Sequence, residues 1–159
     1  MNSLTRFALI ASLSFYQLLA NATPTVQQAA AHLVDLRGIG NNLRSMSLEL
    51  ATKTMTYSMI VYKVGPVAAR ISIEHEIDVL IPNYQTHWNY NLSVIYARHL
   101  PMEALVSIAS EGRESKYVGN LSEKLNAIGG DMKAQSMPTL IEMVSAALER
   151  TFAKVTESN

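Results

Sequence analysis

The chain has no cysteine, and this absence excludes several kinds of site. Without a thiol there is no disulfide, no thiolate ligand for zinc or iron, and no acylated cysteine of the kind that tethers bacterial lipoproteins. Tryptophan occurs once in 159 residues, and there are only seven glycines and five prolines. The fold must therefore depend on apolar packing and hydrogen bonds rather than on cross-links through sulfur.

Neither sign of charge dominates, because 13 Lys and Arg residues balance 13 Asp and Glu residues. Proteins that bind phosphate backbones or anionic lipid need a concentrated positive field, so we expect no nucleic acid and no membrane surface as partner. Beyond the N-terminal region, no apolar stretch approaches the roughly 18 residues that a membrane-spanning helix requires. We therefore expect no membrane anchor. We also expect no cofactor, since no glycine-rich phosphate loop occurs, and no catalytic triad, since no nucleophile elbow occurs.

The N-terminal region has the pattern of a secretory signal peptide. A short polar stretch with one positive charge, Arg6, leads into an apolar run over residues 7–20, which is too short to cross a bilayer comfortably. Small residues then occupy Ala20 and Ala22, the two positions that a signal peptidase reads. We predict that residues 1–22 are removed on export and that the mature protein is periplasmic.

The mature chain, residues 23–159, has a length typical of one domain. Its apolar residues recur with helical spacing, and no segment shows the alternation of a strand bounded by hairpin turns. Glycine and proline fall between the apolar stripes, where they end and start helices. We predict an all-α fold, a single bundle of five to seven helices. The expected helices cover residues 25–36, about 41–64, 66–99, 101–109, 118–128 and 138–152.

Proline and glycine raise two questions of helix continuity. The stripe from Pro66 to His99 contains Pro82, and an internal proline removes one backbone hydrogen bond at a cost of about 3 kcal/mol. The stripe is thus either one helix kinked near Pro82 or two helices, and the kinked helix is the simpler interpretation. The pair Gly129 and Gly130 is predicted to end the helix that precedes it.

An aromatic and polar series on this stripe is the first candidate site. Tyr and Trp combine a large apolar body with a polar tip, which favours them at binding surfaces, but a helical aromatic row is more often part of the core. Core packing and a groove for a ligand or partner are therefore alternatives. Three methionines, Met46, Met55 and Met59, carry the same two interpretations. The residues of the proposed groove are Tyr84, His87, Trp88, Asn91 and Tyr96.

The densest polar cluster is the second candidate. Glu74 and Asp78 share a helix face at i and i+4, and His75 and Glu76 lie between them. A second histidine at i+4, which the zinc-protease arrangement requires, is absent. We predict a solvated helix face and no metal site here. A hydrolase or metal-dependent enzyme that uses Glu74, His75 and Asp78 is the alternative.

The second half of the chain carries a family resemblance. The segment Tyr96–Leu105, with Ser110, Gly112 and Lys116 after it, resembles the bacterial exported family catalogued as domain of unknown function 2059, over roughly residues 80–130. That family has an aromatic residue before a helix start, an acid and a leucine inside the helix, and a Ser-Pro-x-Gly break with a following lysine. Here the break is one residue shorter and lacks the proline. The resemblance implies a helical, exported bacterial protein without an assigned activity.

Three classes of function are compatible with these patterns. The first is a periplasmic binding or protein-interaction module, an adaptor, chaperone-like factor or inhibitor, whose partner is a protein or a small apolar ligand. The second is the enzyme with a site near Glu74, His75 and Asp78. The third is a structural envelope protein that forms homo-oligomers through the stripe from Ile73 to Ile95. We favour the first class, because it needs no catalytic constellation and the sequence shows none.

Overall fold

The structure is a computed structural model that describes residues 24–157. Its regular structure there consists of six α-helices and two short 3₁₀ helices, so the prediction of an all-α fold with five to seven helices is confirmed. The predicted signal peptide lies outside the described residues. Within residues 24–157, no helix is both long and apolar enough to cross a bilayer. The elements are α2 Val26–Leu36, η1 Ile39–Asn42, α3 Leu43–Thr52, α4 Met55–Val64, α5 Pro66–His99, α6 Met102–Glu111, η2 Gly112–Glu114 and α7 Val118–Glu157.

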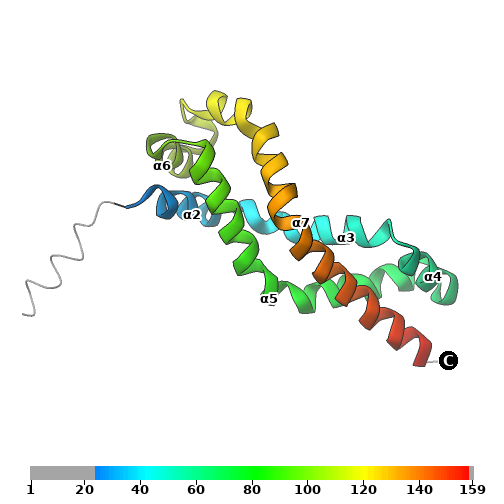
Figure 1. The fold of residues 1–159 in the computed structure, drawn as a ribbon. Coiled ribbons are helices and arrows are strands. Elements are labelled where there is room, and N and C mark those ends of the chain that lie inside the picture. The colour runs from blue at the N-terminus through cyan, green and yellow to red at the C-terminus, as the bar shows by residue number, and fades with distance from the viewer. Residues whose placement is uncertain (1–23, 158–159) are drawn as a thin grey trace, which may run out of the picture.

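Two long helices, α5 and α7, form the frame on which the shorter helices pack (Figure 1). At one end α2 packs against α5 and α6, and toward the other end α3 and α4 each pack against both long helices. Figure 1 shows α4 and the C-terminus at the end opposite α2 and α6. One connected cluster of buried apolar residues takes members from all six α-helices, so the described chain has a single core.

Helices α5 and α7 run antiparallel, and polar contacts between them define their register. As residue numbers fall along α5, the numbers of the partners rise along α7. A residue near 133 in α7 therefore lies beside a residue near 96 in α5. The contacts are His99 with Asp131 at 2.9 Å, Asn91 with Ser136 at 3.1 Å, and Tyr84 with Glu142 at 3.0 Å.

The stripe from Pro66 to His99 is a single helix of 34 residues, as the kinked-helix interpretation predicts. Figure 1 shows α5 bent near its middle, where the internal Pro82 falls in the sequence. Proline has no N–H, so the backbone carbonyl of Asp78 loses its helical hydrogen bond. Both Pro82 and Asp78 are exposed, so water can reach this carbonyl. The helix starts after Gly65, whose φ of 82° lies in the region that favours glycine.

The single helix predicted over residues 41–64 is wrong, because the structure divides it into α3 and α4. Thr54 has an extended backbone, and its hydroxyl accepts a hydrogen bond from the Tyr57 N–H at 3.2 Å, which caps the start of α4. Asn42 stands directly before α3 but makes no capping bond. Its side-chain oxygen instead accepts a hydrogen bond from Trp88.

The predicted helix end at Gly129 and Gly130, with a new helix after Pro138, is also wrong. Helix α7 runs through all three residues and is 40 residues long. An internal glycine costs roughly 1 kcal/mol relative to alanine and a proline about 3 kcal/mol. Tertiary contacts offset this cost, because Ile128 and Ser136 are buried on either side of the glycine pair.

Candidate functional site

An apolar pocket lies between the second half of α5, the first half of α7 and the segment that joins α2 to α3. Its volume is about 370 Å³, which falls in the range of roughly 300 to 1,000 Å³ that is usual for small-molecule sites. Two aromatic residues, Trp88 and Tyr96, and three methionines, Met46, Met132 and Met137, form much of its wall. The aliphatic part of the wall consists of Ile39, Leu92, Leu125, Ile128 and Leu140.

Trp88 and Tyr96 are the two members of the predicted groove that line this pocket. Together with Leu92 they follow i, i+4 spacing, so they project from the same face of α5. Trp88 is only 2% exposed, and its indole Nε1 donates a hydrogen bond to the Asn42 Oδ1 at 3.1 Å. The residue is thus part of the core, as its stripe position predicts, and also part of the pocket wall.

The other three residues of the predicted groove lie outside the pocket lining. Asn91 is buried, and its side-chain amide donates to the Ser136 hydroxyl, which joins α5 to α7. The Tyr84 hydroxyl donates to Glu142 farther along the same helix pair. His87 is exposed. A groove of all five residues is not formed, because the period of 3.6 residues turns positions 87 and 91 away from the face that carries Trp88.

Half of the pocket wall comes from α7, which the sequence analysis did not connect to the aromatic stripe. Leu125, Ile128 and Met132 keep helical spacing across the two glycines, and this continuous spacing was the signal that could have located the wall. Of the three methionines considered for a groove, Met46 lines the pocket. Met55 and Met59 are exposed on α4.

Two features give the pocket its electrostatic character. Lys133 is the single charged residue of the lining and is exposed at the pocket surface. Burial raises the pKa of the Tyr96 hydroxyl, so this group is protonated and can donate a hydrogen bond at neutral pH. The pocket thus combines an apolar wall with one cation, one hydroxyl donor and the side-chain amide of Asn42, whose oxygen accepts from Trp88.

The acidic cluster on α5 is used for ion pairs, to Arg44 of α3 and to Arg70 of α5 itself. Arg44 of α3 binds Asp78 at 2.6 Å and approaches Glu74 at 3.7 Å, and Arg70 also binds Glu74 at 2.8 Å. The guanidinium of Arg44 lowers the pKa of Asp78 below its usual value. His75 is exposed and forms no hydrogen bond or ion pair with either carboxylate among residues 24–157, although its charge contributes a little to the lowered pKa of Asp78. This geometry gives no support to an enzyme site, and within residues 24–157 no group of three or more His, Asp and Glu could hold a metal.

One member of this cluster does not lie on a solvated face. The side chain of Glu76 is buried, with the whole residue 3% exposed, and its carboxylate accepts a hydrogen bond from the Lys154 ammonium of α7. Glu76 faces the core side of α5 because it lies one position before the buried Ile77 and three after the buried Ile73. The sequence analysis placed Glu76 in one cluster with Glu74 and Asp78, but those two side chains face Arg44 of α3 and not the core.

Asp131 connects the first half of α7 to the end of α5. Its carboxylate lies 2.9 Å from the His99 Nε2 and 2.9 Å from the Arg98 guanidinium. These two neighbours, His99 first, lower the pKa of Asp131. A carboxyl group whose pKa is lowered by folding stabilises the folded state above its unfolded pKa of about 4. That contribution is lost as the pH falls through the lowered value.

We therefore expect Asp131→Asn to loosen the first half of α7. Backbone amides in residues 118–137 should exchange hydrogen faster than in the wild type, whereas those in residues 140–155 should change little. The variant should also show a weaker loss of stability below about pH 4, because it lacks the carboxyl group that must be protonated. Hydrogen exchange followed by mass spectrometry measures the first effect. Glu123→Gln, an exposed substitution on the same helix, is the control, and equal exchange in the two variants would disprove the connection.

Comparison of the chain with models of known protein families, with curated proteins and with solved structures found no match. The resemblance of residues 80–130 to domain of unknown function 2059 therefore stays a prediction. No relative supplies a ligand or a residue role, so the function has to be argued from the pocket itself.

Proposed function

We propose that the protein is an exported, periplasmic binding module that takes up a small apolar ligand in the pocket between α5 and α7. The composition of the wall carries this proposal. It is aromatic, aliphatic and methionine-rich, with one charged residue. Such walls with few polar groups are typical of small-molecule sites. Methionine is flexible and polarizable, so three of them allow the wall to adapt to the shape of a ligand.

The first half of α7 supports the proposal because it provides a way in. Among its residues 118–137 only Ile128 and Ser136 are buried, whereas the second half contributes most of the buried residues of this helix. A segment with so few buried contacts opens at low free energy. Gly129 and Gly130 lower its helical stability further. Local opening of this segment would expose the pocket without unfolding the core.

Gly129 offers a direct test, because it lines the pocket and its neighbour Gly130 does not. A Cβ atom at either position would meet nothing within 4 Å, so a larger side chain fits at both. Gly129→Leu places a side chain in the pocket, and Gly130→Leu is the matched control with the same gain in helix propensity. The neutral fluorescent probe N-phenyl-1-naphthylamine should bind the wild type and Gly130→Leu alike. It should bind Gly129→Leu at least about tenfold more weakly.

Two results would contradict the proposal: a wild type that does not bind the probe, or equal binding by the two leucine variants. The export part rests on the pattern of residues 1–22 and has its own test. N-terminal sequencing of the protein from a periplasmic extract should start at Thr23, and an exported form that retains Met1 would contradict it.

A further inference from the structure

The hydroxyl of Tyr96 is the first of two polar groups that bear on the ligand's chemistry. Tyr96 is 6% exposed and lines the pocket. Its hydroxyl has no hydrogen-bond partner among residues 24–157, whereas the other buried polar side chains of α5 each have one, such as Asn91 with Ser136. None of the fully buried side-chain polar atoms of residues 24–157 lacks a partner, so this unpaired hydroxyl oxygen is itself still accessible. Its O–H is therefore available to donate to a ligand atom that accepts a hydrogen bond.

The ammonium of Lys133 is the second group. It is the only charge in the pocket lining, and no ion pair or hydrogen bond engages it among residues 24–157. The nearest acid in the sequence is Asp131, whose carboxylate is already occupied by Arg98 and His99. Within the described part of the chain, a positive charge without an ion-pair or hydrogen-bond partner thus stands at the edge of an apolar pocket.

The register of the two long helices places these groups at the same level. Lys133 lies between Asp131, which contacts His99, and Ser136, which contacts Asn91. It is therefore opposite the part of α5 that carries Tyr96. Trp88 lies eight residues earlier, or about 12 Å along the helix. The pocket consequently has Tyr96 and Lys133 at one end. At the other end lies Trp88 with Asn42, whose side-chain oxygen already accepts the indole hydrogen bond.

We propose that the ligand is an apolar molecule with one anionic group, such as a single-chain carboxylate, whose charged end lies between the Tyr96 hydroxyl and Lys133. This inference rests on the proposed function and narrows it to a class of ligand. A carboxylate only accepts hydrogen bonds, so it matches a site whose free groups are both donors. The apolar chain then lies along the methionines toward Trp88. A cationic ligand is disfavoured because the lining has no acid.

Three probes with the same carbon chain test the inference: dodecanoate, dodecanol and dodecyltrimethylammonium, each below its micelle concentration. Titration calorimetry should show the wild type binding dodecanoate most tightly and the cation most weakly. Lys133→Gln and Tyr96→Phe should each weaken dodecanoate binding by roughly tenfold, the usual scale for a hydrogen bond to a charged group, and leave dodecanol binding unchanged. Tyr96→Phe should fold normally, since the hydroxyl that it removes has no partner.

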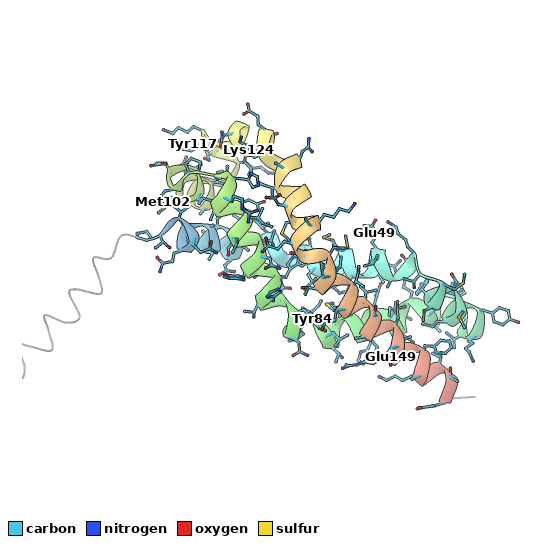
Figure 2. All side chains as sticks on the ribbon, in the orientation of Figure 1. Glu49, Tyr84, Met102, Tyr117, Lys124 and Glu149 are labelled. Atoms are coloured by element: carbon cyan, nitrogen blue, oxygen red, sulfur yellow. The ribbon has the colours of Figure 1, made fainter. Side chains whose placement is uncertain are left out.

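Matched controls lie on the same two helices outside the pocket. Lys124→Gln removes a charge from the exposed part of α7 (Figure 2), and Tyr90→Phe removes a hydroxyl from an exposed position of α5. Both should bind dodecanoate like the wild type. If dodecanol binds as tightly as dodecanoate and the two pocket variants have no effect, the anionic class is wrong, while binding of the neutral probe still supports the proposed function. If neither dodecanoate, dodecanol nor N-phenyl-1-naphthylamine binds, both the inference and the proposed function are overturned.

Discussion

Replacing Trp88 by alanine is expected to lower the free energy of unfolding by about 3 to 5 kcal/mol, the usual range for removing a large buried aromatic side chain. The indole is 2% exposed, and its N–H donates to Asn42, so the variant loses both the packing and the link from α5 to the start of α3. Total stability of a domain is about 5 to 15 kcal/mol. The loss is therefore a large fraction of the whole, and denaturant unfolding followed by circular dichroism measures it.

A matched control is available two residues along the same helix. Tyr90 is 59% exposed, and Tyr90→Ala should change stability by no more than about 0.5 kcal/mol. Since Trp88 is the only tryptophan, its emission also reports its surroundings in the native protein. An unchanged melt of Trp88→Ala, together with native emission like that of free tryptophan, would contradict the core position.

The second large effect is expected at the ion pair between Glu76 and Lys154. Lys154→Met removes the ammonium that binds a buried carboxylate. A buried charge that loses its partner lowers the free energy of unfolding by about 1 to 3 kcal/mol or more. Because the lysine side chain is largely exposed, we expect a loss near the lower end of that range. We expect the denaturant midpoint of the variant to fall accordingly at neutral pH.

A double-mutant cycle separates the lost pair from lost packing. Glu76→Leu combined with Lys154→Met should recover most of the stability, because two apolar side chains leave no charge in the core. Lys53→Met is the control, since Lys53 pairs with Glu49 on the surface of α3 and such pairs contribute little. A double variant that is as unstable as the sum of the single variants would show that the two side chains act independently.

The fold class and the majority of the helix boundaries could be predicted from local signals. Pro66 starts α5, Gly112 follows α6 at a φ of 62°, and the stripe that carries Trp88 is buried. These features depend on residues within one or two turns of each other, which a single sequence displays directly.

Two helix boundaries were predicted wrongly, because the first depends on a single side-chain cap and the second on contacts between distant segments. Helix α3 ends at Thr52 and Thr54 caps the next helix, although the apolar spacing continues past both residues. Gly129 and Gly130 have the local signature of a helix end, but burial of Ile128 and the contact of Asp131 with α5 keep the helix intact. Tertiary packing of this kind routinely overrides helix propensity.

The candidate pocket was only partly predictable for the same reason. Trp88 and Tyr96 could be selected because they recur with helical spacing and combine an apolar body with a polar tip. Lys133 and Met132 carry no local sign of a site, and they reach the pocket only because α7 folds back antiparallel to α5. No spacing within one sequence encodes a contact between segments that lie about 40 residues apart.

Methyl NMR of the methionine side chains tests the central claim most directly, because two sets of methionines differ in their position relative to the pocket. Met46, Met132 and Met137 line the pocket, whereas Met55 and Met59 are exposed on α4. On titration with the neutral probe N-phenyl-1-naphthylamine, the methyl signals of the first set and the indole N–H signal of Trp88 should shift together, and those of the second set should stay in place. Shifts confined to Met55 and Met59, or no shift in any methionine, would contradict a ligand pocket between α5 and α7.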